Sequence, residues 1–281
     1  MLSNKILSKM VYPDFLYVIV LYKVQLISSK TYQTFIRSYP ELKLFVYDNS
    51  PNPQNITRPN TIYIHDARNS GLSLAYNKAA KYANEHGFRW LLILDQDTDL
   101  SCISIEDYEK AISSYPQIKL FAPKVNCGTR FMSPTKVWNK MMFLQDKVPS
   151  GILSLSKYSI INSGMCVNVD AMIKCGGYKE DVFLDYSDHQ FIERFKKLYP
   201  TCFIIDKEIK QSFSTVTDDK PSTINRYILF CKSVKAFEKH CFADNFWLFV
   251  TVLKRGISIC LKNKTLKPLK YFISGYLSIC K

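Results

Sequence analysis

The sequence contains few glycines, only nine in 281 residues. None of them belongs to a G-x-G-x-x-G turn, and no G-x-x-x-x-G-K-[ST] loop is present. Dinucleotide-binding folds and P-loop proteins use these turns to hold phosphates, so their absence argues against both classes. A phosphorylated ligand would need another partner, and a divalent cation held by carboxylates is the usual one.

Cysteine patterns that bind metal or form disulfides are also missing. The nine cysteines include no C-x-x-C pair, and their number is odd. A zinc cluster and a disulfide framework are therefore poorly supported, whereas free thiols in a reducing cytosol fit the pattern.

Long hydrophobic runs are absent as well. The apolar stretch FLYVIVLY (15–22) is too short to span a bilayer. Pro13 and Asp14 interrupt the apolar character before it, and no small-residue cleavage site follows. The stretch predicts a buried first strand rather than a signal peptide. Hydrophobic residues make up 47% of the chain and charged residues 22%, which favours a packed domain over disorder.

Negative charge is scarce, because 24 Asp and Glu stand against 38 Lys and Arg. The net charge of +14 suits nucleic acid, an anionic membrane surface or phosphorylated small molecules. Nucleic acid is the least favoured of these, since the basic residues are spread along the chain. After Asp244 the chain has no acid, and its Lys and Arg residues alternate with Phe, Trp and Tyr. This tail predicts either packed helices with a solvated lysine face or interfacial helices on an anionic membrane.

The first half alternates apolar strands with helical segments. We expect strands at 16–22, 42–49, 61–66, 90–97, 119–125 and 202–206, and helices at 26–39 and 71–87. Residues 126–160 look irregular, 161–199 hold a strand, a short helix, a Gly-Gly turn and a helix, and helices follow from 224. The pattern predicts an α/β fold with a mostly parallel central sheet flanked by helices, and ligands beyond the carboxyl ends of the strands. We expect a catalytic domain at 1–220 and a basic helical segment at 221–281.

Two acidic groups are candidates for chemistry. Asp95 and Asp97, in DQD after the apolar run 91–94, could share one Mg²⁺ or Mn²⁺ ion. A solvated acidic turn is the simpler alternative for such a pair. Asp185 and Asp188 precede a helical stretch, where an acid could serve as a general base or simply cap the helix. The helix at 71–87 is expected to be capped by Asn69 or Ser70.

In this order the stretches resemble family 2 glycosyltransferases, which are inverting enzymes with the A-type glycosyltransferase fold, and especially their bacterial rhamnosyltransferase branch. The resemblance covers about residues 15–215. It rests on VIVLYK, VYDNSP, DARNSGLSLAYNKA, WLLILDQDT and INSGMCVNVDAMIKCGGYKEDVFLDYSDHQFIERF. The combination of LDQDT and FLDYSD at this spacing is specific, whereas either motif alone would not be.

The resemblance implies a role for each matching residue. Asp97 would be the metal ligand, supported by Asp95. Asp188 matches the catalytic aspartate that deprotonates the acceptor hydroxyl, and Asp185 is the second candidate. The implied donor-binding residues are Tyr22, Lys23, Asp48, Asn49, Asp66, Arg68, Asn69 and Asp95. Ser163 and Gly164 would line the acceptor side.

Two positions depart from the family pattern. The first strand ends in LYK where Thr-Tyr-Asn is usual, and Gln211 stands where relatives commonly have histidine. The resemblance implies transfer of a sugar, rhamnose by the branch pattern, from a dTDP- or UDP-linked donor. The acceptor would be a glycan or lipid-linked glycan in surface polysaccharide synthesis, such as lipopolysaccharide or capsule. The location would be cytoplasmic, with a peripheral place on the inner face of the plasma membrane.

Other functions stay open at this point. A UDP-hexose or galactofuranose transferase fits the same motifs, and Gln211 is compatible with a non-catalytic protein that binds glycans or nucleotide sugars. A sugar-nucleotide pyrophosphorylase is disfavoured, because the first strand is not followed by a glycine-rich loop.

Overall fold

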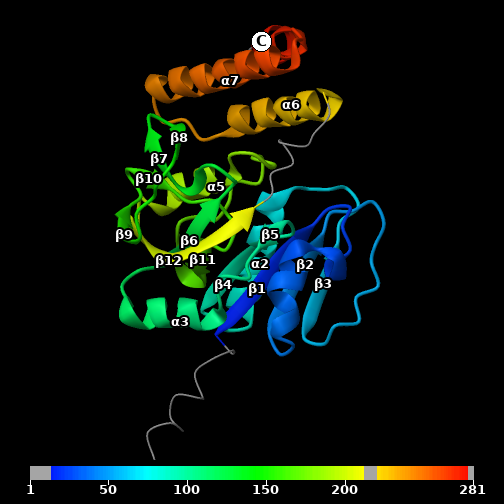
Figure 1. Ribbon diagram of the computed structural model, residues 1–281, viewed down its shortest axis with the longest axis vertical. Helices are drawn as coiled ribbons and strands as arrows, with labels where there is room; N and C mark the ends of the chain where they lie inside the picture. Colours follow the sequence, from blue (N-terminus) through cyan, green and yellow to red (C-terminus); the bar gives the residue numbers. More distant parts are fainter. Residues whose placement is uncertain (1–13, 212–219, 278–281) are drawn as a thin grey trace, which may run out of the picture.

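A mixed β-sheet forms the centre of the protein, and a layer of C-terminal helices lies over one end of it (Figure 1). The computed structural model describes residues 14–211 and 220–277. Its N-terminal half contributes four strands, β1 (Phe15–Leu21), β2 (Lys43–Asp48), β3 (Thr61–His65) and β4 (Trp90–Asp95). They pair in parallel in the order β3-β2-β1-β4. These four strands were all expected from their apolar runs.

The rest of the sheet is mixed. It contains β5 (Thr98–Asp99), β6 (Leu120–Asn126), β7 (Phe131–Trp138), β8 (Met141–Gln145), β9 (Gly151–Ser154), β10 (Tyr158–Ser159), β11 (Cys166–Asn168) and β12 (Thr201–Gln211). The main path runs β10-β7-β6-β11-β4-β1-β2-β3, and β12 is parallel to β6 but antiparallel to β5 and β9. The α/β class with a helix-flanked sheet is confirmed, and its parallel part is concentrated in the first four strands.

The segment 126–160 was expected to be irregular, and this was wrong. It contains β7, β8, β9 and β10. β7 pairs with β6 and β9 pairs with β12, whereas β8 and β10 pair with β7. The strands are short, and several of their side chains face solvent. They therefore lack the continuous apolar runs that revealed the buried strands.

The expected helix at 26–39 is also broken into pieces. Its parts are η2 (Leu26–Ser28), α1 (Lys30–Thr34) and η3 (Ile36–Ser38). The hydroxyl of Ser29 accepts the backbone N–H of Tyr32 and so caps a new helix within the segment. Phe35 then leaves the helical region with φ −137°.

Two long helices cover the two faces of the sheet. The helix α2 (Leu72–Glu85) packs on the face that carries Val18, and α3 (Ile105–Ser114) packs on the face that carries Tyr17. All seven residues of β1 are buried, because successive side chains enter opposite apolar clusters. This double burial explains why β1 is apolar throughout.

The C-terminal helices form a third apolar cluster. After α4 (Val169–Lys174) and α5 (Ser187–Phe195) come α6 (Lys220–Ala236), α7 (Phe242–Asn263), α8 (Lys267–Tyr271) and the π-helical segment η5 (Phe272–Leu277). Tyr227, Phe230, Leu248 and Val252 pack together with Val182 from the loop before α5. The helical layer is thus joined to the sheet domain by a small core. Over the described residues, no helix has both the length and the apolar character needed to cross a membrane.

Candidate active site

The strand register brings several polar strand tips to one edge of the sheet. Asp95 at the end of β4 pairs with Val20 of β1, and Asp48 at the end of β2 pairs with Leu21. Asp48 and Asp95 therefore lie two strands apart, which is roughly 10 Å. The end of β12 reaches the same edge, because Gln211 pairs with Thr98 directly after the D-x-D turn.

Gln211 bridges the two carboxylates of this turn. Its Nε2 donates to Asp95 Oδ2 and to Asp97 Oδ1, both at 3.2 Å. The hydroxyl of Ser163 lies 2.5 Å from Asp95 Oδ2 and 2.7 Å from Gln211 Oε1. Its single proton can be donated to only one of these acceptors at a time. Four side chains from separate parts of the chain thus form one polar network.

The two carboxylates of this network receive hydrogen bonds from neutral groups, and the network itself contains no positively charged side chain. Burial, followed by the nearby charge of Asp97, raises the pKa of Asp95 to about 6. Burial likewise raises the pKa of Asp97, while the amide of Gln211 and the charge of Arg226 partly oppose this shift. Two adjacent buried carboxylates with raised pKa values fit a bound divalent cation, which would favour their ionised form. Among the described residues, no three His, Cys, Asp or Glu side chains come together as a metal site, so this pair would need ligand oxygens as well.

Asp95 is held from its other side by two hydroxyl groups. Tyr76 of α2 donates to Asp95 Oδ1 at 3.2 Å, and Thr31 of α1 hydrogen-bonds to the Asp95 carbonyl. Tyr76 is fully buried, and its ring lies 5.1 Å from that of Tyr178. These contacts fix the D-x-D turn against the sheet. They could not be predicted from the sequence, because Tyr76 occupies an ordinary apolar position of a helix.

The expected nucleotide-base residues are mostly engaged within the protein. Asp48 accepts the hydroxyl of Tyr63 at 2.9 Å and the backbone N–H of Ser50 at 2.9 Å. Asn49 donates to the Gly71 carbonyl at 3.4 Å, and its buried Oδ1 has no hydrogen-bond partner in the part of the chain that is described. Tyr22 is 42% exposed at the tip of β1. Tyr22 and Lys23, which are both exposed, and Asn49 Oδ1 are therefore the groups of this set that remain available to a ligand.

Lys23 and Asn69 both occupy the left-handed backbone region, with φ of 56° and 53°. The Lys23 N–H donates to the Ser50 hydroxyl at 2.8 Å, which fixes the turn after β1 next to β2. The expected cap at Asn69 or Ser70 was wrong, because Gly71 is the N-cap residue of α2. Gly71 has φ +90°, and an added Cβ would stand 2.5 Å from the carbonyl oxygen of Phe183. A side chain at position 71 would collide with Phe183, so a glycine is required there. The helix therefore begins after Gly71 and not after the expected Asn69 or Ser70.

Asp66 is tied into the wall of the site. It accepts the hydroxyl of Tyr47 at 2.8 Å and the Nε of Arg68 at 3.3 Å. Hydrogen bonds, first that of Ser70 and then those of Tyr47 and Arg68, lower its pKa. The side chain of Arg68 remains 83% exposed and can reach a ligand, whereas Asp66 serves to orient its neighbours.

The acceptor-side residues join the same network. Ser163 contacts Asp95, as described above, and precedes Gly164 with φ +73°. The Gly164 carbonyl accepts the hydroxyl of Tyr108 at 2.8 Å. A Cβ at Gly164 would lie 3.0 Å from Pro123, so the turn that presents Ser163 is packed from behind.

Asp188 lies in the first turn of α5 and within electrostatic range of the D-x-D turn. Burial raises its pKa, whereas the charge of His189 lowers it. The charge of Asp188 also contributes to the raised pKa of Asp95. His189 is held by Ser159 at 2.5 Å from Nδ1, and burial lowers its pKa. The structure thus brings together Asp95, Asp97, Ser163 and Asp188 from distant parts of the sequence.

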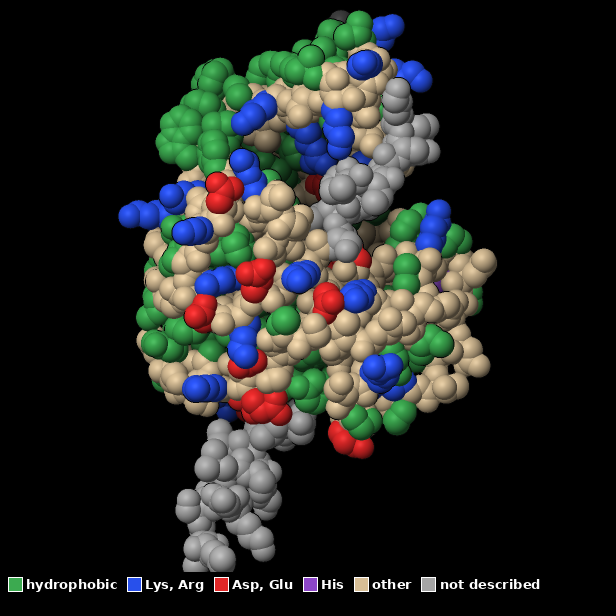
Figure 2. Space-filling model, viewed as in Figure 1, with side chains coloured by type: hydrophobic (Ala, Val, Ile, Leu, Met, Phe, Trp, Pro, Cys, Tyr) green, Lys and Arg blue, Asp and Glu red, His purple; other side chains and the backbone are tan. Residues whose placement is uncertain are grey.

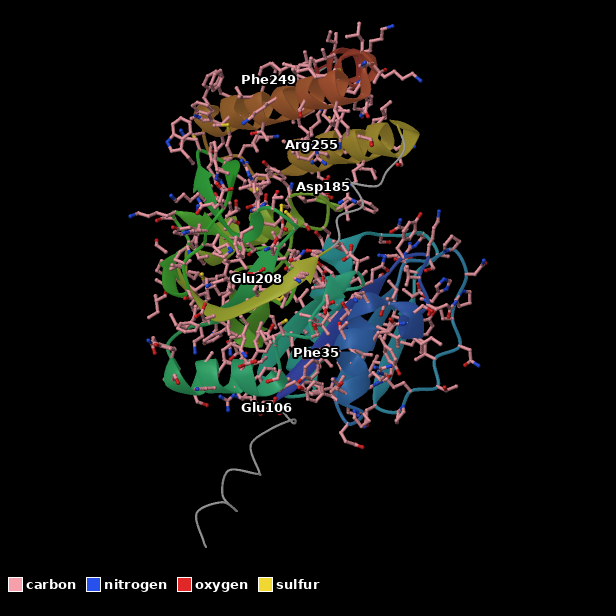
Figure 3. The ribbon with its side chains drawn as sticks, in the orientation of Figure 1. Phe35, Glu106, Asp185, Glu208, Phe249 and Arg255 are labelled. Atoms are coloured by element: carbon pink, nitrogen blue, oxygen red, sulfur yellow. The ribbon has the colours of Figure 1, made fainter. Side chains whose placement is uncertain are left out.

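Asp185 has a different environment. Its Oδ1 lies 3.0 Å from Arg226 of α6, and its Oδ2 lies 3.2 Å from Arg255 of α7. Figure 3 shows Asp185 beside Arg255 at the junction between the helical layer and the sheet domain. Two ion pairs favour a bridging role for Asp185 over a catalytic one. The two arginines were missed because they fall in a segment expected to be an appendage.

Comparison with solved structures identifies the architecture. GalNAc-T7, in a structure with UDP, GalNAc and Mn²⁺, matches with a TM-score of 0.53 and 11% identity over 79% of this chain. The mannosyltransferase PcManGT from Pyrobaculum calidifontis, in complex with GDP-Man and Mn²⁺, matches with a TM-score of 0.53 and 11% identity over 95% of it. The chain has the fold of nucleotide-sugar glycosyltransferases.

The coverage differs between these two relatives. The aligned part makes up 80% of the mannosyltransferase but only 48% of GalNAc-T7. No family model matches the sequence, and no curated protein is similar to it at a significant level. At 11% identity the likeness to the glycosyltransferases establishes the fold, and the chemistry must be inferred from the site itself.

Proposed function

We propose that the protein is an inverting glycosyltransferase that moves a sugar from a nucleotide-diphosphate donor to a glycan or lipid-linked glycan. The observation that carries this proposal is the network of Asp95, Asp97, Ser163 and Gln211 at the carboxyl ends of the strands, with Asp188 in electrostatic range. In a sheet of this kind, ligands bind at that edge.

Asp97 and Asp95 would hold the divalent cation, Mn²⁺ or Mg²⁺. Their raised pKa values and the absence of a third carboxylate, histidine or cysteine among the described residues fit an ion that also takes oxygens from the donor. A bound ion would neutralise the negative charge of the departing nucleotide diphosphate. The positive charge of Arg226 acts on Asp97. We propose that Arg226 also helps to balance the negative charge of the departing diphosphate.

Asp188 is assigned as the general base. Burial raises its pKa, so its carboxylate is a better proton acceptor than an exposed aspartate. It takes the proton of the acceptor hydroxyl while the acceptor oxygen forms a bond to the anomeric carbon. The bond from that carbon to the diphosphate oxygen breaks, and the leaving group keeps the electron pair. A single displacement of this kind inverts the anomeric centre.

The remaining assignments follow the same proposal. Tyr22, Lys23, Asp48 and Asn49 would lie around the nucleotide base, and Arg68 and Asn69 would border the diphosphate and sugar. Ser163 and Gly164 would face the acceptor. Rhamnose from a dTDP-linked donor is the proposed sugar, and the product would enter surface polysaccharide. Membership of family 2, a cytoplasmic location and a peripheral place on a membrane belong to this proposal as well.

A panel of dTDP-, UDP- and GDP-linked sugars with Mn²⁺ or Mg²⁺ tests the activity through donor hydrolysis and transfer. We expect Asp97→Ala and Asp188→Asn each to lower transfer about a hundredfold or more, as loss of a metal ligand or a general base does. Asp99→Asn is the matched control. Asp99 belongs to the same acidic turn but pairs with Lys30 at 3.1 Å.

The two variants are expected to differ in how well they bind the donor nucleotide. Asp97→Ala should abolish metal-dependent nucleotide binding, and Asp188→Asn should leave it intact. A protein that binds nucleotide sugars but neither hydrolyses nor transfers them would instead be the non-catalytic binder. Near-normal turnover of Asp188→Asn would remove that residue from its role.

A further inference from the structure

Four exposed apolar side chains lie along one side of α7. Phe242 is 84% exposed, Leu261 76%, Phe246 48% and Ile257 42%. At 3.6 residues per turn, these four side chains fall within an arc of roughly 100° on the helix. Single exposed apolar residues are common on protein surfaces, but a continuous arc along a helix marks an interaction site.

The tip of the β7–β8 hairpin extends this surface. Trp138 is 54% exposed, and its ring lies 4.7 Å from that of Trp247 in α7. Figure 2 shows hydrophobic side chains gathered where this hairpin meets the start of α7 and continuing along the top of the helix. We name this surface, made of Trp138, Phe242, Phe246, Ile257 and Leu261, the α7 face.

Positive charge borders the α7 face. Lys254 is exposed at one edge of the arc, and Lys264, Lys267 and Lys270 are exposed just beyond the end of α7. No acidic residue follows Asp244 in the sequence. Asp244 itself lies near Lys140 and accepts the His240 N–H, so it does not offset the lysines. Apolar and aromatic groups bordered by lysines are the composition of helices that lie in an anionic membrane interface.

We infer that the α7 face docks the protein on the surface of an anionic lipid bilayer, with α7 lying in the membrane plane. A second copy of this chain fits less well, because a symmetric contact would bring the same lysines together. A membrane-crossing position is not available to α7, since none of the described helices is long and apolar enough.

Docking in this orientation would turn the proposed active site away from the lipid. Arg255 points roughly opposite the centre of the arc on α7 and pairs with Asp185, three residues before Asp188. The bilayer and the proposed catalytic base would thus lie on opposite sides of one helix. This arrangement suits an acceptor whose sugar projects from a lipid anchor, a consequence that rests on the proposed function.

Vesicle flotation of the full chain, without any nucleotide, tests the inference. We expect binding to phosphatidylcholine vesicles that contain phosphatidylglycerol, and weaker binding in high salt or to phosphatidylcholine alone. The double variant Phe242→Ser/Leu261→Ser should bind about tenfold more weakly or worse, because two apolar side chains no longer enter the interface. Lys254→Glu/Lys264→Glu should lose the preference for phosphatidylglycerol.

A control variant removes two other exposed apolar side chains that lie outside the α7 face. Ile27 is 66% exposed and Leu198 55%, and Ile27→Ser/Leu198→Ser should bind vesicles like the wild type. Absence of vesicle binding by the wild type, or equal binding by the α7 variants, would overturn the inference. A wild-type dimer that Phe242→Ser/Leu261→Ser converts to a monomer, without vesicle binding, would assign the face to a second copy instead. Nucleotide-sugar binding, measured separately, reports on the proposed function whatever the vesicles show.

Discussion

At the scale of single residues, Gln211 is the most informative departure from the expected pattern. A histidine at this position would offer a metal ligand, whereas the glutamine donates its amide to both acids of the D-x-D turn. The amide takes up lone pairs that a cation would otherwise use. Metal binding at this pair, as proposed above, would therefore have to displace a hydrogen-bonded amide.

Changing Gln211 should alter the metal affinity in a predictable direction. We expect Gln211→His to bind Mn²⁺ about tenfold more tightly or better without nucleotide, because an imidazole replaces the competing amide donor. Titration of free Mn²⁺ by electron paramagnetic resonance measures this directly. Gln145→His, in β8, controls for adventitious binding by an added imidazole. Equal Mn²⁺ affinities of Gln211→His and the wild type would show that the amide does not limit metal binding.

At the scale of secondary-structure elements, α3 contains a carboxylate in an unfavourable place. Glu109 Oε1 is buried and has no hydrogen-bond partner among the described residues. Burial, with a smaller contribution from Glu106, raises the pKa of Glu109 from 4.5 to about 7. A raised pKa means that the folded state holds the proton more tightly than the unfolded state. The folded state is therefore destabilised as the pH rises through this range.

We expect Glu109→Gln to be more stable than the wild type at pH 8 and similar to it near pH 4.5. The difference should grow as the pH rises from 4.5 to about 7 and then stay constant, since the wild type is ionised in both states above that pH. Urea unfolding at several pH values measures it. Glu106→Gln is the control and should give a smaller, partial gain, because it removes only the neighbouring charge. A pH-independent difference for Glu109→Gln would contradict the assignment.

At the scale of the whole molecule, Asp185 joins the helical layer to the sheet domain. Its side chain is 14% exposed and pairs with one arginine from α6 and another from α7. Arg255 also lies over the ring of Phe230, at 4.1 Å from its centroid. Asp185 therefore helps to fix the C-terminal helices relative to the proposed base, together with the apolar core that joins them to the sheet domain.

Asp185→Asn should reduce the free energy of unfolding by about 1–3 kcal/mol, because two partly buried arginines lose their counter-charge. Asp188→Asn should not reduce it, since burial already disfavours the charged form of Asp188. Chemical denaturation of both variants, together with transfer assays below the unfolding transition, separates the two acids. If Asp185→Asn were fully stable but inactive, Asp185 rather than Asp188 would be the better candidate for the base.

The sequence by itself determined the strands β1, β2, β3 and β4. Strands covered on both faces, as β1, β2 and β4 are, must be apolar throughout, and β3 at the edge is still half-buried. It also located the acids that follow them, since polar groups at strand ends interrupt those runs sharply. The tertiary structure alone decided which of these groups meet. Gln211 reaches Asp95 through the pairing of β12 with β5, and Asp185 finds two arginines more than forty residues away. Half-exposed strands such as β7 and β8 and contacts made across long sequence distances leave no periodic signal, so only the folded chain reveals them.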